Sequence, residues 1–179
     1  AALAARPPLD IRVNTLKADR ARVIAELEGT QAAPTVLAPH GVRIPPIDGS
    51  GRHPNAQAEP AFQKGWFEVQ DEGSQLAAEL AGAKPGMQVL DYCAGAGGKT
   101  LALSAAMENR GQIFAHDSEK SRLAPMFDRL RRSDNRNVQV VAKQSELTSL
   151  SGHMDIVLID APCTGSGTWR RRPDAEWRL

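Results

Sequence analysis

Hydrophobic and polar positions change their pattern near residue 62 of this 179-residue chain. After residue 62, short apolar runs typical of buried strands alternate with segments of helical periodicity. The apolar runs predict strands at 87–92, 111–117, 137–142 and 154–161. The periodic segments predict helices at 71–83, 99–108 and 119–132. This alternation predicts an α/β fold, a Rossmann-like parallel sheet covered by helices on both faces.

The third predicted helix carries two local signals. Ser118 stands where an N-cap belongs, and Pro125 lies inside the periodic segment, where proline kinks a helix. The last predicted strand has no later partner in the sequence, so the parallel sheet is expected to be incomplete.

Residues 1–62 predict a small α+β unit that precedes the parallel sheet. Asp19 is a suitable N-cap for a helix over 20–28, and Gly29 is a suitable stop. The rest of this unit is interrupted by proline and glycine, which favours short strands and loops. We therefore expect two units, residues 1–62 and residues 63–179, the first of them an RNA-binding appendage.

Composition and charge restrict the function only loosely. The chain is 41% hydrophobic and 24% charged, which is typical of a globular protein, and its formal charge of +1 excludes no class of partner. No apolar run approaches the roughly 20 residues that cross a bilayer. The two cysteines have no other cysteine or histidine nearby at metal-ligand spacing, so we expect no metal site. Such a low number of cysteines suits a protein of the reducing cytoplasm. The oligomeric state stays open.

A glycine-rich loop, "VLDYCAGAGGKT", follows the first strand of the parallel sheet. Gly98, Lys99 and Thr100 match the end of a P-loop, but Cys93 stands where that motif begins with glycine. A dinucleotide fingerprint fails because its third glycine position is Thr100.

The same loop also fits a site for S-adenosylmethionine, which is the interpretation we prefer. Asp91 closes the first strand, the glycines permit a sharp turn, and Asp117 closes the second strand. A carboxylate in that position commonly binds ribose hydroxyls. Ligands of parallel sheets bind at the carboxyl ends of strands, where all of these residues are expected.

Two long motifs, "DYCAGAGGKT" and "DAPCTGSGTWRRRPD", closely resemble those of the Fmu/Sun family of RNA cytosine-5 methyltransferases. The segments "PPLDIRVNTLK" and "FEVQDEGSQLAAEL" also look like that family, so the resemblance spans nearly the whole chain. It implies a class I methyltransferase sheet, S-adenosyl-L-methionine as cofactor, and methylation of cytosine carbon 5 in ribosomal or transfer RNA.

The resemblance also implies roles for individual residues. Asp160 would lie near the methyl donor and the target base, and Cys163 would assist product release. The RNA side would include Trp169, Arg170 and Arg171, whereas we favour a solvated helix face for the basic cluster at 129–132. The implied cofactor-binding residues are Asp91, Cys93, Ala94, Gly95, Ala96, Gly97, Gly98, Lys99, Asp117 and Asp160.

Two departures from the family pattern limit what the resemblance implies. Where members commonly place an aspartate for the adenine side, this chain reads "VVAKQSEL", so Gln144, Ser145 or the backbone are the candidates. The family's attacking cysteine follows a threonine on a later strand. Since Cys93 is expected to pack under the loop, the attacking cysteine should lie outside this chain. The 179 residues alone should therefore be inactive.

The alternatives are a non-catalytic RNA- or cofactor-binding fragment and, less favoured, a P-loop nucleotide hydrolase.

Overall fold

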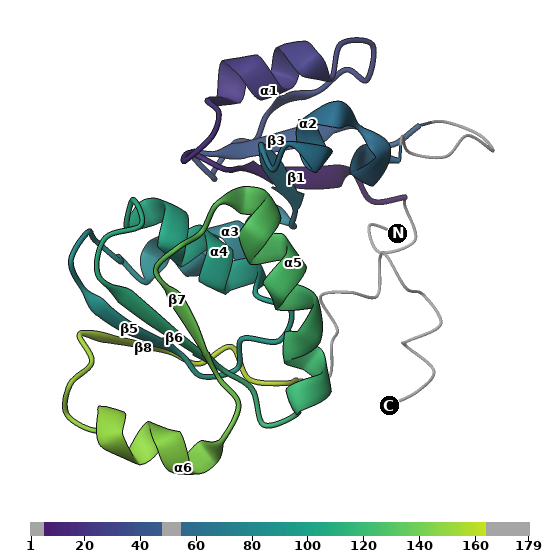
Figure 1. Ribbon diagram of the computed structural model, residues 1–179. Coiled ribbons are helices and arrows are strands. Elements are labelled where there is room, and N and C mark those ends of the chain that lie inside the picture. Colours follow the sequence, from purple (N-terminus) through teal and green to yellow (C-terminus); the bar gives the residue numbers. More distant parts are fainter. Residues whose placement is uncertain (1–5, 48–54, 164–179) are drawn as a thin grey trace.

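The computed structural model describes residues 6–47 and 55–163, which form an antiparallel sheet followed by a parallel sheet (Figure 1). The elements of the first unit are β1 (Leu9–Val13), α1 (Arg20–Glu26), β2 (Ala33–Pro34), β3 (Gly41–Ile44), η2 (Ala56–Ala58), α2 (Pro60–Gln63) and β4 (Phe67–Val69). They are followed by α3 (Glu72–Leu80), β5 (Gln88–Asp91), α4 (Gly98–Ala106), β6 (Gln112–His116), η3 (Lys120–Leu123), α5 (Ala124–Ser133), β7 (Val138–Val141), α6 (Gln144–Leu147), η4 (Thr148–Leu150) and β8 (Ile156–Leu158).

The first unit is an antiparallel sheet with strand order β2-β3-β1-β4 and its own apolar core. Asp19 caps α1 as predicted, because its side chain accepts a hydrogen bond from the Arg22 amide at 2.8 Å. β4 pairs with β1 from Ile11↔Val69 to Val13↔Phe67, so this sheet extends past residue 62. A strand of three residues has too few positions to show a periodic pattern.

The second unit is the predicted parallel sheet, with strand order β7-β6-β5-β8. β5 lies between β6 and β8 and pairs in parallel with both. The parallel sheet preceded by a small α+β unit confirms the predicted fold class.

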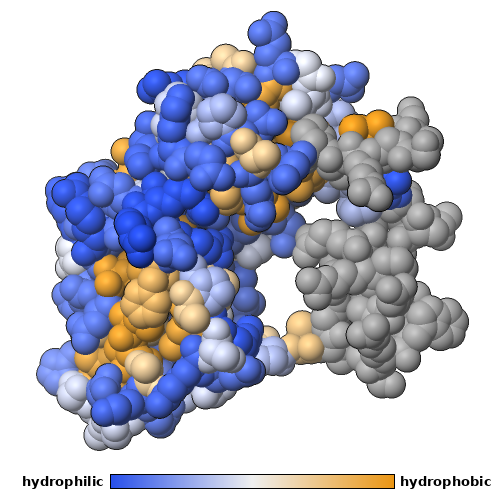
Figure 2. Space-filling view, turned by 45° about the vertical axis from the view of Figure 1, so that its right-hand side comes forward, coloured by the Kyte–Doolittle hydropathy of each residue, from blue (hydrophilic) through white to orange (hydrophobic). Residues whose placement is uncertain are grey.

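The two faces of the parallel sheet differ: among the described residues α4 and α5 pack on one face, whereas the other face is exposed at β8, so the expected helix cover is not met there. Alternate residues of a strand share a face, so Val89, Ile113 and Ala115 lie on one face, which packs against α4 and α5. Val157 lies on the opposite face, in register with Leu90, and is 52% exposed. Figure 2 shows a broad hydrophobic area on the surface of this unit.

The segment before α5 also differs from its prediction. Among the described residues no side chain caps η3, and Asp117 rather than Ser118 accepts the Glu119 amide hydrogen, at 3.0 Å. Pro125 lies in the first turn of α5, following the 3-10 turn, so it starts the helix instead of kinking it. Proline is tolerated there because the first helical amides have no intrahelical acceptor.

The two units are joined at the C-terminal end of α5, beside the first sheet in Figure 1. The buried Asn14 side chain donates hydrogen bonds to the carbonyl oxygens of Gly65 and Ser133, at 2.9 and 2.8 Å. Lys17 Nζ donates to the Arg132 carbonyl at 3.0 Å. Helix ends leave carbonyls without intrahelical partners, so the first unit supplies donors that α5 needs. Within the described ranges, no helix is long and apolar enough to cross a membrane.

Candidate functional site

The two motifs singled out in the sequence meet at the carboxyl edge of the parallel sheet. The glycine loop follows β5, and the segment from Asp160 to Cys163 follows the neighbouring β8. Lys99 Nζ, at the start of α4, lies 2.5 Å from Asp160 Oδ2. Both segments line one cavity of about 160 Å³, whose wall includes Asp91, Cys93 to Ala96, Gly98, Lys99, Arg122 and Asp160.

Asp91 is a buried carboxylate at the wall of this cavity, with 1% of its surface exposed. Its Oδ2 accepts a hydrogen bond from Thr100 Oγ1 at 2.7 Å, while Oδ1 has no partner among the described residues. Burial raises the pKa of Asp91 to about 6, although the Thr100 hydroxyl and the Lys99 ammonium oppose that rise. A buried acceptor without a donor is costly, so this oxygen is suited to a cationic or N–H group of a ligand.

The glycine loop is held in one conformation by its own backbone and by Asp117. The Ala94 amide donates to the His116 carbonyl at 2.8 Å, and the Gly95 amide donates to Asp117 Oδ2 at 3.0 Å. Gly97 has φ +85°, and a Cβ there would lie 2.7 Å from Met126 Cγ. The loop therefore needs glycine at residue 97, both for its dihedral angle and for its packing under α5.

Asp117 occupies the predicted position after β6, but Arg122 covers it. Its side chain is 2% exposed, and Arg122 Nη1 lies 3.2 Å from its Oδ2. Its Oδ1 accepts the Glu119 amide hydrogen. The carboxylate thus supports the loop through the Gly95 amide, and Arg122, not Asp117, lines the cavity.

The two cysteines lie in different environments. Cys93 is half-buried at the cavity wall, and burial, with the nearby charges of Asp117 and Asp91, raises the pKa of its thiol. Such a thiol is mostly protonated at neutral pH, in agreement with a packing role. Cys163 is exposed at the sheet edge, three residues after Asp160.

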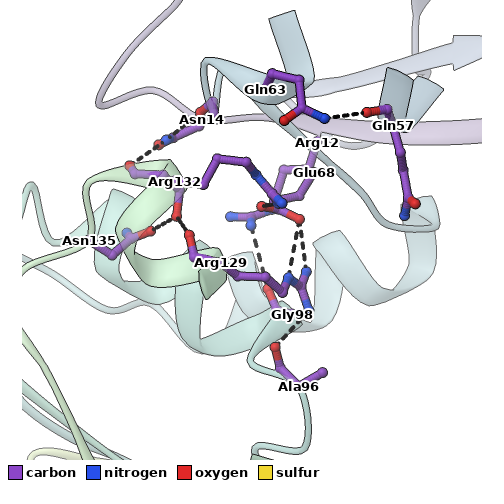
Figure 3. Close-up of polar contacts among 12 residues, drawn as sticks. Arg12, Asn14, Gln57, Gln63, Glu68, Ala96, Gly98, Arg129, Arg132 and Asn135 are labelled. Carbon is purple, nitrogen blue, oxygen red and sulfur yellow. Dashed lines mark hydrogen bonds and ion pairs between the residues drawn. The ribbon is translucent and has the colours of Figure 1, made fainter. Parts of the chain in front are cut away.

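A group of charged residues that the sequence analysis missed lies under the glycine loop (Figure 3). Arg129 of α5 donates to the Ala96 carbonyl at 2.7 Å and also binds the Glu68 carboxylate. Arg132 binds the same carboxylate, so the predicted solvated face at 129–132 was wrong for these two arginines. Arg131 does face solvent, with 79% of its side chain exposed. The sequence did carry a signal for this buried group, because Arg12 and Glu68 are charged residues inside the short apolar segments "DIRV" and "FEV".

The family model described as 16S rRNA methyltransferase RsmB/F matches residues 79–179, which is more than half of the chain. The chain belongs to the RsmB/F family. The Fmu/Sun resemblance predicted from the two motifs is thereby confirmed.

Relatives of this RsmB/F chain agree in sequence and structure. It is 31% identical over 177 residues to a protein from Synechocystis named "Probable ribosomal RNA small subunit methyltransferase B". That alignment covers 96% of this chain and 39% of the relative, so the chain spans about two fifths of its length. The crystal structure of PH0851 superposes with a TM-score of 0.88 at 34% identity, covering 99% of this chain and 40% of that one. A methyltransferase homologue from Pyrococcus horikoshii has a TM-score of 0.80 at 32% identity, with 98% and 57% coverage.

The P-loop alternative does not fit the geometry of the RsmB/F loop. In a P-loop the lysine and the hydroxyl residue face the phosphates and their magnesium ion. Here Thr100 is fully buried and bonded to Asp91, and Lys99 is paired with Asp160. Neither the Thr100 hydroxyl nor the Lys99 ammonium of the RsmB/F chain is therefore placed to bind the phosphates of a nucleoside triphosphate.

The remaining predicted residues are placed only in part. Gln144, in α6, lies within hydrogen-bonding distance of the Tyr92 hydroxyl, 3.2 Å from Nε2, so it reaches the same sheet edge. Ser145 is exposed beside it. Trp169, Arg170 and Arg171 lie outside the described residues.

Proposed function

We propose that this chain forms the cofactor-binding part of an RsmB/F enzyme that methylates carbon 5 of cytosine in ribosomal RNA. One observation carries the proposal. The Lys99–Asp160 pair brings the glycine loop and the Asp-Ala-Pro-Cys segment to one cavity. A methyl donor held by the loop would therefore face residues 160–163, where the pyrimidine belongs.

The residues at this edge fit S-adenosyl-L-methionine. Asp91 Oδ1, buried without a partner in the described chain, suits the ammonium group of the methionine moiety. The backbone from Cys93 to Lys99 would enclose that moiety, with the first amides of α4 available as donors. Both oxygens of the Asp117 carboxylate already have partners, one of which is the half-exposed Arg122 side chain. Asp117 would therefore bind the ribose hydroxyls after Arg122 has moved aside. Gln144 is our candidate for the adenine side.

The reaction divides between the cofactor and protein groups. When bound, S-adenosyl-L-methionine supplies an electrophilic methyl group. Carbon 5 of cytosine becomes nucleophilic only after a thiolate adds at carbon 6, and the thiol leaves again once the carbon-5 proton is removed. We assign the addition to a cysteine outside residues 1–179, since burial raises the pKa of the Cys93 thiol and keeps it protonated, and the family resemblance gives Cys163 the accessory role. Cys163 would assist product release, and Asp160, held by Lys99, would orient the base.

The substrate has to be opened before it can react. A stacked cytosine is out of reach of a thiol, so the base must leave its stack. Unpaired RNA is commonly recognised by aromatic and guanidinium stacking, which Trp169, Arg170 and Arg171 would supply.

Calorimetry tests the cofactor part of this proposal. We expect the 179-residue chain to bind S-adenosylhomocysteine and to show no measurable binding of ATP. Binding of ATP without binding of S-adenosylhomocysteine would overturn the assignment in favour of a nucleotide hydrolase.

A methyl-transfer assay tests whether the attacking cysteine lies outside residues 1–179. We expect the 179 residues alone to transfer no labelled methyl group to unmodified ribosomal RNA. Turnover by this chain would refute the placement of the attacking cysteine elsewhere, whereas binding without turnover agrees with it.

A further inference from the structure

The Glu68 carboxylate, only 4% exposed, lies among three guanidinium groups from both structural units (Figure 3). Arg129 donates to its Oε2 from Nε and Nη2, at 3.2 and 3.0 Å, and Arg132 pairs with Oε1. Arg12 is the strand partner of Glu68 in the β1–β4 register and is itself buried. One negative charge thus faces three positive charges, and Glu68 belongs to the first unit whereas Arg129 and Arg132 belong to α5.

Two of these arginines also contact the backbone of the glycine loop. Arg129 Nη1, which does not bind Glu68, donates to the Ala96 carbonyl at 2.7 Å. Arg12 Nη2 lies 3.5 Å from the Gly98 carbonyl, a longer and weaker contact. The planar fork of Arg129 therefore spans from the carboxylate of one unit to the loop of the other, which a lysine could not do.

The direction of the Ala96 carbonyl matters for the loop. A peptide plane is rigid, so fixing this carbonyl on the α5 side also fixes the neighbouring amide of Gly97. That amide donates to the Ala94 carbonyl at 2.9 Å and closes the turn. Asp117 holds the same turn from the other side through the Gly95 amide. Arg129 and Asp117 thus hold the loop between them.

We propose that Arg129, aligned by Glu68, is a positioning residue that holds the glycine loop in its ligand-binding shape. The antiparallel unit then contributes to the cofactor site without touching the cofactor. The identity of the ligand in this inference rests on the proposed function, whereas the contacts of Arg129 are those of the structure.

Two substitutions on one helix separate positioning from general stability. Arg129→Gln removes the contact with Ala96 and one pair with Glu68. Arg132→Gln is the matched control, because the contacts of Arg132 in the described chain are with Glu68, the Phe62 ring at 3.8 Å and, through its carbonyl, Lys17. Glu68 itself is left unchanged, since its loss would leave the buried Arg12 and the partly buried Arg129 and Arg132 without their shared carboxylate and would lower the stability of the whole chain. Arg129→Lys keeps the charge but loses the fork.

The first measurement is hydrogen exchange of the Gly95 and Gly97 amides in the free chain, beside the thermal midpoint of each variant. We expect about tenfold faster exchange in Arg129→Gln, as for loss of one charged hydrogen bond. Arg132→Gln should lower the thermal midpoint while leaving these amides protected, and Arg129→Lys should lie between. Equal exchange in the two glutamine variants, or unchanged exchange in both, would overturn the inference.

The second measurement is affinity for S-adenosylhomocysteine. Arg129→Gln should weaken binding about tenfold, whereas Arg132→Gln should stay within about twofold of the unaltered chain. Equal weakening by both variants would also overturn the positioning role. If the unaltered chain binds no S-adenosylhomocysteine, the proposed function fails, and the exchange comparison still decides the role of Arg129.

Discussion

Asp91 illustrates a conflict between stability and ligand binding within one side chain. Its pKa rises from the ordinary 3.8 to about 6 because the carboxylate is buried, and one of its oxygens lacks a partner in the described chain. A carboxyl with a raised pKa binds more protons in the folded state than in the unfolded state. The free energy of unfolding therefore falls as the pH rises from about 4 to about 6. The ionised form is a cost that a cationic ligand can offset.

We predict that Asp91→Asn stabilises the free chain and weakens its binding of S-adenosylhomocysteine. Above pH 6 the variant should gain up to about 3 kcal/mol in unfolding free energy, and the gain should vanish near pH 4, where the native carboxyl is protonated. Urea unfolding at pH 4, 6 and 8 measures this, and calorimetry at pH 8 measures the affinity. Asp128→Asn serves as control, since that carboxylate is exposed. A variant less stable than the native chain at pH 8 would contradict the account.

Among single residues, the sequence predicted the types and order of the site groups better than their partners. Asp91 and Asp160, at the ends of neighbouring parallel strands, do reach one cavity, together with Lys99 from the start of α4. The pairing of Lys99 with Asp160 joins segments far apart in the chain, and the pairing of Asp117 with Arg122 depends on the side-chain conformations within one turn. Sequence patterns do not encode such distances.

At the scale of elements, the start of α4 depends on how α5 packs over it. Gly97 is the N-cap of α4 and lies against Met126 and Leu101. Gly29, near the end of α1, has a nearly identical φ of +86°, but a Cβ at that residue would meet no described atom within 4 Å beyond its chain neighbours. The two glycines thus share one backbone requirement and differ in their packing.

We predict that Gly97→Ala destabilises the chain by about 2–4 kcal/mol, because the methyl group adds overlap with Met126 to the strain of a left-handed residue. Gly29→Ala should cost only about 1 kcal/mol, the strain alone. Denaturant unfolding of both variants measures the difference. Equal costs would mean that the backbone dihedral angle, and not the contact with α5, dictates glycine at residue 97.

Element prediction succeeded where apolar runs are long and failed where tertiary contacts decide. The strands β5 to β8 and the capped helix α1 were predicted from pattern alone. β4 was missed because three residues carry no period, and its strand status comes from pairing with β1. The basic cluster of α5 was misassigned because a helix sequence does not show that Glu68 lies opposite it.

At the scale of the molecule, one face of the parallel sheet is open to solvent at β8 in the described part of the chain. Val157, at 52% exposure, lies on that face, and the exposed Ile159 follows two residues later. Contiguous apolar surface of this kind favours association. The helices α4 and α5 leave it uncovered because both pack on the other face.

We predict that the chain binds a hydrophobic dye such as ANS while folded, and that this face accounts for much of the signal. The double substitution Val157→Thr and Ile159→Thr should lower the fluorescence by about half and change stability by less than about 1 kcal/mol. Val36→Thr, at an 87% exposed position of the first unit, should leave the fluorescence unchanged. A dye signal that survives the double substitution would place the apolar surface elsewhere.

By itself, the sequence determined the α/β class, the strand order along the chain, the family, and which residues stand at strand ends. Those properties follow from local periodicity and from contiguous motifs, which chain connectivity preserves. Only the tertiary structure decided that Glu68 and Arg129 meet under the glycine loop, that Lys99 pairs with Asp160, and that one sheet face is exposed at β8 among the described residues. These contacts join residues far apart in the chain, and their energies depend on burial and distance, which exist only after folding.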